Sequence, residues 1–107
     1  MKIEYGNAAL VQLYAPVTCN THAMLEMSKF AGGCTIIEGK GEWLHNKDWA
    51  NEAVRKYEWV VTKYVRYPIE LATDLCKAFL KDNPNEVEAL CTVSADGETI
   101  YVRCTRE

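Results

Sequence analysis

The chain has 107 residues, of which 49% are hydrophobic and 25% charged, and its formal net charge at pH 7 is −3. This length suits one domain, and the composition is that of a globular rather than a disordered chain. No apolar stretch reaches the ~18 residues of a membrane-spanning helix, the N-terminus has no signal-peptide core, and the basic excess of a generic nucleic-acid binder is missing. We therefore expect one cytoplasmic domain, residues 1–107, without membrane or generic nucleic-acid binding.

The first half of the chain predicts two strands and a short helix. Ala8–Val17 alternates between apolar and mixed positions, which indicates a strand. Asn20–Ala31 carries apolar residues at helical spacing. Cys34–Leu44 alternates again, and the polar residues His45–Asn51 predict a turn after it.

The next segments predict a returning strand and a well-defined helix. Glu52–Val65 alternates imperfectly. A helix opens at Tyr67-Pro68, because proline suits the first helical position, and Asp82-Asn83-Pro84 ends it. We expect its buried stripe to consist of Ile69, Ala72, Leu75, Cys76, Phe79 and Leu80.

The last segments predict a β-hairpin. Glu86–Ser94 and Thr99–Cys104 read as strands, and Asp96-Gly97 between them is a strong two-residue turn signal. The whole order predicts an α+β fold, a ferredoxin-like βαββαβ arrangement with an additional C-terminal β-strand, whose helices lie on one face of a mostly antiparallel sheet.

The opposite sheet face is expected to stay open. The residues assigned to it are Leu10, Gln12, Tyr14, Glu38, Lys40, Glu42, Lys56 and Glu58. Leu10 and Tyr14 are too apolar for ideal solvent-facing residues, and Tyr101 lies on the expected edge strand. Because edge strands pair readily and closed dimers are common, we predict a homodimer or higher even oligomer, formed by the open face or the terminal strand.

The carboxylates on the central strands, Glu38, Glu42 and Glu58, have two interpretations. Paired carboxylates can perform acid–base chemistry. Lys40 and Lys56 lie among them, however, and cross-strand charge pairs are ordinary surface support. The sequence favours this second interpretation.

The cysteines indicate reduced, mainly structural thiols, because their number is odd and no C-x-x-C spacing occurs. They are Cys19, Cys34, Cys76, Cys91 and Cys104. Cys19 and His22 form C-x-x-H at an expected helix N-terminus, which can stabilise a thiolate, so they are weak candidates for a catalytic pair. A structural role is the favoured alternative. Zinc binding by Cys19, His22 and Cys34 would need a fourth ligand, and we expect neither metal nor cofactor.

Aromatic and basic residues gather between residues 43 and 67, where they could stack a base and hold a phosphate. The candidate ligand-binding residues are Arg55, Lys63, Arg66, Trp49, Tyr64 and Tyr67. Tyr57 and Trp59 are better explained by core packing.

Two motifs in the middle of the chain carry a family resemblance. They are Phe30-Ala31-Gly32-Gly33-Cys34-Thr35 and Glu38-Gly39-Lys40-Gly41-Glu42-Trp43. Over residues 28–80 the chain resembles a group of small uncharacterised bacterial and phage proteins with a GG-x-T turn and a G-x-G-x-W strand. The resemblance implies a ferredoxin-like fold and is compatible with a phage or mobile-element origin, but it implies no activity.

The sequence therefore predicts a small non-enzymatic interaction protein, a phage or mobile-element accessory that inhibits a host system, with itself or a host protein as partner. Two alternatives stay open. One is a protein that sequesters a nucleotide-like small anion, and the other is a thiol-dependent enzyme that uses Cys19.

Overall fold

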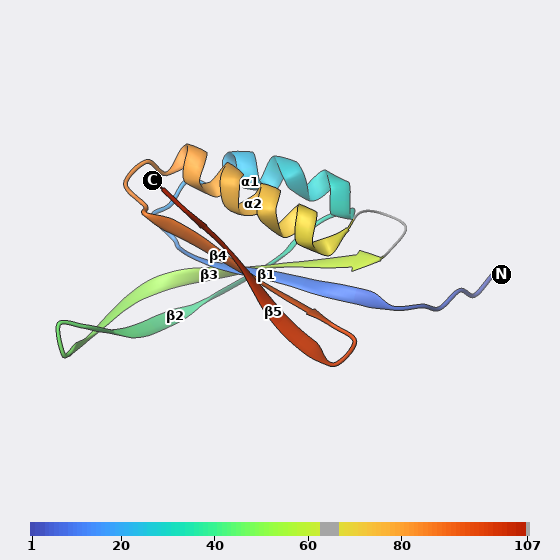
Figure 1. Ribbon diagram of the computed structural model, residues 1–107, viewed down its shortest axis with the longest axis horizontal. Coiled ribbons are helices and arrows are strands. Elements are labelled where there is room, and N and C mark those ends of the chain that lie inside the picture. Colours follow the sequence, from blue (N-terminus) through green and yellow to red (C-terminus); the bar gives the residue numbers. More distant parts are fainter. Residues whose placement is uncertain (63–66, 107) are drawn as a thin grey trace.

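The computed structural model describes residues 1–62 and 67–106, apart from the side chains of residues 43 and 45. Its described strands form one antiparallel sheet in the order β2-β3-β1-β4-β5, and the helices cover one face of it (Figure 1). The elements are β1 (Ala8–Pro16), α1 (His22–Glu26), the 3-10 helix η1 (Met27–Ala31), β2 (Thr35–His45), β3 (Asp48–Thr62), α2 (Pro68–Asp82), β4 (Glu88–Ala95) and β5 (Glu98–Thr105).

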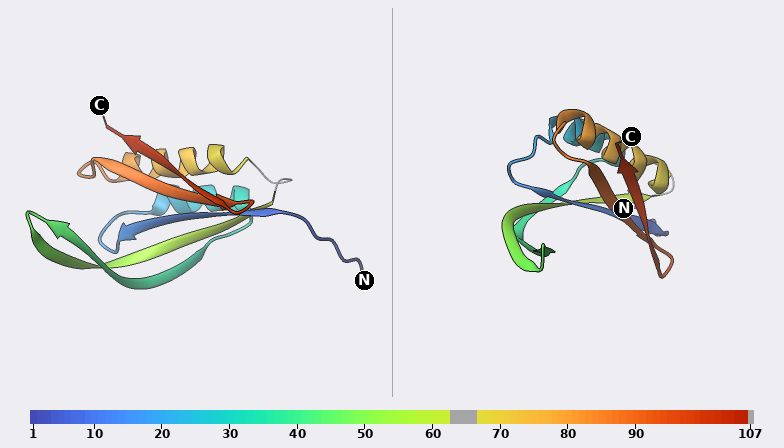
Figure 2. Two further views of the ribbon diagram at one scale, coloured as in Figure 1. Left: turned by 60° about the horizontal axis from the view of Figure 1, so that its bottom comes forward. Right: turned by 60° about the vertical axis from the view of Figure 1, so that its left-hand side comes forward.

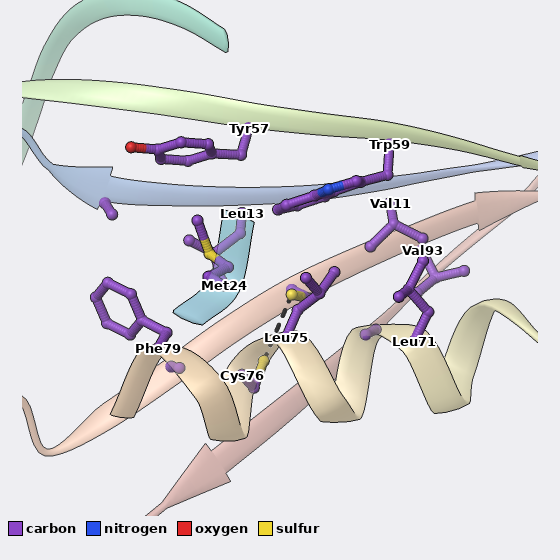
Figure 3. Close-up of a cluster of buried hydrophobic side chains, with 14 of the residues drawn as sticks. Val11, Leu13, Met24, Tyr57, Trp59, Leu71, Leu75, Cys76, Phe79 and Val93 are labelled. Atoms are coloured by element: carbon purple, nitrogen blue, oxygen red, sulfur yellow. Dashed lines mark hydrogen bonds between the residues drawn. The ribbon is translucent and has the colours of Figure 1, made fainter. Parts of the chain in front are cut away.

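The core lies between the sheet and the helices (Figure 3). Val11 of β1 pairs with Trp59 of β3, and Leu13 pairs with Tyr57. Cross-strand partners share a face, so this register points all four side chains at the helices, where each is at most 2% exposed. The strand alternation predicted from the sequence is confirmed here.

Polar groups in the core find partners inside it. Trp59 Nε1 donates a hydrogen bond of 2.8 Å to Ser28 Oγ of η1, and the Tyr57 and Trp59 rings stack with centroids 6.2 Å apart. The thiols of Cys76 on α2 and Cys91 on β4 lie 3.4 Å apart between helix and sheet. As expected from their apolar positions, these two cysteines are fully buried and free.

Helix α2 confirms the predicted start and stop. Pro68 occupies the first turn, and the carbonyls at the other end accept hydrogen bonds from Arg106, whose Nη2 donates to Leu80 O and Asn83 O. The predicted stripe is wrong at one position. Ile69 is 53% exposed, and Leu71 is buried in the core instead, because Leu71 lies one turn before Leu75 on the face of α2 that meets the core.

The two hairpins differ in how well the sequence predicted them. Asp96 and Gly97 form the expected two-residue turn, with φ values of 53° and 79° and Ala95 paired with Glu98. The β2–β3 turn is tighter than predicted. Asn46 and Lys47 alone connect the strands, with φ values of 49° and 69°, so residues 48–51 belong to β3 rather than to a polar turn.

The ferredoxin-like βαββαβ assignment is corrected to a five-stranded antiparallel α+β sheet in the described part of the chain. The strand order and the extra C-terminal strand agree with the prediction. The first crossover, however, is a five-residue α-helix followed by a 3-10 helix. In addition, β1 pairs with β4 over only four residues, Leu10–Leu13, and β2 and β3 run beyond β1 as a two-stranded arm (Figures 1 and 2).

The register also corrects the membership of the open face. Glu38 pairs with Arg55, which alternates with the buried residues Tyr57 and Trp59, so Glu38, Lys40 and Glu42 share the helix side of the sheet. The predicted carboxylate cluster is therefore divided between two faces. Among the described residues, no helix has the length and apolarity needed to cross a membrane.

Candidate functional site

The sheet face opposite the helices (Figures 1 and 2) carries a row of polar residues, which the strand pairings place at its centre. Glu58 of β3 pairs with Gln12 of β1 on one side and with Thr35 of β2 on the other, and Gln12 pairs with Thr92 of β4. The register that builds the core also positions the row, because Gln12, Glu58 and Thr92 each lie next to buried residues of their own strands.

Glu58 is the centre of a small charged network. Gln12 Nε2 donates to Glu58 Oε1 at 2.8 Å, and Lys56 Nζ lies 2.8 Å from the same oxygen. The side chains of Lys56 and Glu58 are only 26% and 22% exposed. Hydrogen bonds from Lys56 and Gln12 lower the pKa of Glu58, and the bond to Glu58 raises the pKa of Lys56. Both groups are therefore charged at neutral pH.

A hollow of about 280 Å³ lies next to this network at the end of the first crossover. It is lined by Ala31, Gly32, Gly33, Cys34, Thr35, Glu58 and Val60. Gly32 has a φ of 79° in the left-handed conformation that ends η1, which glycine adopts without strain. A side chain atom at Gly33 would meet nothing within 4 Å, so the space above the turn is open.

The chemistry available in the hollow is that of a hydrogen-bond acceptor in a partly apolar setting. Among the described residues, both side-chain contacts of the Glu58 carboxylate end on Oε1, which leaves Oε2 to accept from a ligand. Burial raises the pKa of the neighbouring Cys34 thiol, so this group stays neutral. A carboxylate of this kind suits hydroxyl or amine donors of a small molecule.

The Cys19–His22 candidate lacks an activated thiol. Cys19 Sγ lies 3.7 Å from Glu86 Oε1, and burial together with that carboxylate raises its pKa to about 11. Helix α1 is only five residues long, so its dipole does not offset these effects. The expectation of a stabilised thiolate is wrong. In the described residues, no group of three or more His, Cys, Asp or Glu side chains is placed to hold a metal ion.

The three predicted anion-binding residues that the structure describes are not brought together. Trp49 lies near the tip of the β2–β3 arm, paired with Leu44, and is 74% exposed. Arg55 forms an ion pair with Glu38 at 3.1 Å, and Tyr67 lies beyond the far end of β3, immediately before α2. Trp49 and Thr62 are separated by about 40 Å of extended strand. The other candidates, Lys63, Tyr64 and Arg66, lie outside the described residues.

The predicted interface residues do share one surface. Tyr14 and Tyr101 are 61% and 64% exposed, and the pairings place both on the open face together with the half-buried Leu10. Val60 beside Leu10 is 63% exposed. The polar network is therefore surrounded by apolar side chains that none of the described helices covers.

Two members of the polar row, Gln12 and Glu58, are assigned to the open face by the sequence, but nothing in the sequence identifies them as a site. Glu58 and Lys56 were assigned to the open face and interpreted as surface support, and Gln12 was assigned there too. The available signal was that Lys56 and Glu58 lie together on the polar side of the returning strand. The cross-strand neighbours that complete the network are set by the register of strand pairing. This register cannot be predicted from the sequence alone.

No protein-family model matches the chain, and no curated protein sequence is significantly similar to it. Two solved structures share its fold over the whole length. A phage S-adenosylmethionine (SAM) lyase in complex with S-methyl-5′-thioadenosine superposes with a TM-score of 0.69 at 10% identity, covering 99% of this chain and 95% of that one. A phage SAM lyase in the apo state gives 0.57 at 12% identity, with 100% and 98% covered.

These comparisons correct the predicted function. The sequence indicated a non-enzymatic interaction module, whereas both of these full-length structural neighbours are described as lyases. An interaction protein, an anion-sequestering protein and a Cys19 enzyme were interpretations of residue patterns alone. At 10–12% identity, this similarity of fold is beyond the reach of the motifs that the sequence displays.

Proposed function

We propose that this chain is a phage enzyme that cleaves S-adenosylmethionine to S-methyl-5′-thioadenosine, as a SAM lyase. The observation that carries the proposal is the full-length structural similarity to a SAM lyase holding that nucleoside. A fold by itself does not determine an activity, so the argument also rests on the open-face site. Removal of SAM deprives host methyltransferases of their methyl donor, which would make the enzyme an inhibitor of host systems.

The identity of the nucleoside fixes the bond that breaks. S-methyl-5′-thioadenosine keeps both the methyl and the adenosyl carbon on sulfur, so the cleaved bond joins sulfur to the amino-acid chain. The electron pair of that bond returns to the sulfonium sulfur and neutralises it. The amino-acid fragment either closes on its own carboxylate or loses a proton to form a double bond.

Glu58 is the residue that we assign to the adenosyl group. Its Oε1 is occupied by Gln12 and Lys56, and the free Oε2 can accept from the hydroxyls of a ribose. The hollow of about 280 Å³ is near the lower end of small-molecule pockets, which start at about 300 Å³. Glu58 thus orients the nucleoside, and the fixed charge pair holds Glu58 in place without reorganisation.

The test is incubation of the purified chain with SAM, followed by mass spectrometry of the products. S-methyl-5′-thioadenosine should accumulate in proportion to enzyme and time. Glu58→Gln should lower the rate by roughly 100-fold, the scale of losing one positioned polar group. Glu38→Gln is the matched control, because Glu38 is also an ion-paired strand carboxylate but faces the other way. No product from the wild-type chain would refute the proposal.

We also propose that the chain self-associates through its open face, as predicted from the sequence. The supporting feature is the apolar surround of the polar network. Its exposed members are Tyr14, Ile37, Val60, Leu90 and Tyr101. A second copy on this face would exclude water from the hollow beside Glu58 and strengthen its electrostatics.

Light scattering at micromolar concentration tests the association. The wild-type mass should exceed that of one 12.1 kDa chain, and Tyr14→Glu should reduce it because a charge would be buried without a partner. Tyr67→Glu is a control, since Tyr67 is 75% exposed but lies outside the sheet. A monomeric wild-type chain at every concentration would contradict the proposal.

A further inference from the structure

The first seven residues form an extended segment that projects from the body of the molecule beyond β1 (Figures 1 and 2). Met1, Ile3 and Tyr5 are 118%, 83% and 100% exposed, so their side chains pack on none of the other described residues. Lys2 and Glu4 occupy the alternate positions and form an ion pair at 2.8 Å. One apolar and one charged face with a period of two is the pattern of an amphipathic strand.

A complementary surface exists at the β5 edge of the sheet. Strand β5 is at the end of the strand order, so its outer edge faces no other strand among the described residues. Between this edge and the start of α2 lies a mainly apolar hollow of about 360 Å³. Its lining residues are Pro68, Ile69, Val93, Ala95, Asp96, Glu98 and Ile100. Ile69 and Ile100 are 53% and 43% exposed there.

The origin of the segment lies close to this surface. Leu10 pairs with Ser94, so Ala8 is at the same end of the sheet as the Asp96-Gly97 turn. The segment continues in the direction of β1 and away from the sheet (Figure 2), and to reach its own β5 it would have to reverse around that turn. The β5 edge of a second copy, related by a two-fold axis at this end of the sheet, can be reached without such a reversal. The segment is long enough to pair along that edge, because seven extended residues span about 23 Å.

We propose that residues 1–7 of one copy add a strand to the β5 edge of a second copy, with Ile3 and Tyr5 seated in the hollow beside Ile69 and Ile100. Main-chain hydrogen bonds to an exposed edge supply affinity and the alternate side chains supply specificity. Because origin and acceptor lie at one end of the sheet, the exchange is reciprocal and closes as a dimer.

The area involved is enough for a stable pair. Met1, Ile3 and Tyr5 together would bury on the order of 450 Å² per segment, given ~150–250 Å² for one aromatic side chain. Counting both segments and the surfaces that they cover, the exchange would bury roughly 1,800 Å², within the ~1,200–2,000 Å² of stable interfaces. The opposite edge, β2, also exposes an apolar residue on the helix side, Ile36 at 47%, but the hollow near the start of β2 is lined by Thr35 and Glu58 of the open face rather than by Ile36.

The experiment replaces Ile3 by the photoreactive residue p-benzoylphenylalanine in the full chain. Equal amounts of ¹⁴N- and ¹⁵N-labelled protein are mixed, irradiated and digested for mass spectrometry. We expect cross-links of mixed isotope composition that join residue 3 to the start of α2 or to β5. Cross-links within single chains only, cross-links to another surface, or none at all would overturn the proposal.

A matched pair of variants localises the contact. Ile100→Asp should lower the cross-link yield by roughly tenfold, because it places a charge in the hollow. Ile36→Asp introduces the same charge at a similarly exposed residue of the other edge and should leave the yield unchanged. Equal loss in both variants would contradict the assignment to β5. The readout needs no SAM, so it stands apart from the test of enzymatic activity.

Discussion

The two faces of the central sheet are built from the same strands but have opposite characters. On the helix side, Tyr57 and Trp59 are at most 2% exposed and their polar atoms bond inside the core. On the open side, the next residues along β3, Lys56 and Glu58, form a charged pair that stays partly exposed. A single strand therefore carries a stability determinant and a candidate site at adjacent positions.

The comparison teaches that stability and function are separable along β3. Side chains alternate across a strand, so a substitution at one residue acts on one face. We expect helix-side substitutions to change the free energy of unfolding and open-side substitutions to change ligand binding, and this separation can be tested at neighbouring residues.

The largest expected effect is on the helix side. Trp59→Ala should lower the free energy of unfolding by about 3–5 kcal/mol, because it leaves a cavity and removes the hydrogen-bond donor of the Ser28 hydroxyl. Val60→Ala, one residue further on and 63% exposed, should stay within about 0.5 kcal/mol. Urea denaturation followed by circular dichroism measures both. Similar losses in the two variants would show that the faces are not independent.

An intermediate effect is expected on the open side, in the pH dependence of nucleoside binding. Lys56 lowers the pKa of Glu58, so the carboxylate is charged at every pH above the ordinary glutamate pKa of about 4.3. This charge is lost only when the pH falls through the lowered pKa. Lys56→Met removes the main cause of that shift. The loss of binding should then begin at higher pH in the variant than in the wild type.

The measurement is the increase in melting temperature on adding S-methyl-5′-thioadenosine between pH 3.5 and 6.5, since a ligand that binds only the folded state stabilises it. Lys40→Met is a suitable control, because Lys40 pairs with Glu42 at 3.3 Å on the opposite face. An unchanged acid limit in Lys56→Met would show that Glu58 does not hold the ligand through its charge.

The smallest effect is expected away from both faces, at Cys19. With a pKa of about 11, this thiol is protonated at neutral pH and should react with iodoacetamide more slowly than a free cysteine. Glu86→Gln should accelerate the reaction, because the carboxylate that raises the pKa loses its charge. Cys19→Ser should leave SAM cleavage unchanged. Peptide mass spectrometry over time gives the alkylation rates, and rapid labelling of wild-type Cys19 would contradict this assignment.

The sequence by itself determined the elements whose signals are local. Alternation in β1 and in the described part of β3 identified the buried face, Pro68 and Asp82 bounded α2, and Asp96-Gly97 specified a hairpin. The turn predicted over His45–Asn51 was too long, because neither Asn46 nor Lys47 is the glycine that usually marks a left-handed position. The first helix was likewise predicted as one continuous helix. Apolar spacing does not distinguish such a helix from a short α-helix that continues as a 3-10 helix.

Only the tertiary structure decided which charged residues meet. A shift of one residue in strand pairing moves every side chain to the other face, and the pairing of β2 with β3 placed Glu38 opposite Arg55 and left Glu58 with Gln12 and Lys56. The raised pKa of Cys19 likewise depends on Glu86, a residue 67 positions away in the sequence. The periodicity of the sequence indicates which residues of one element share a face. A site also depends on the distances between residues of different segments, and these distances are set when the strands pair and the helices pack.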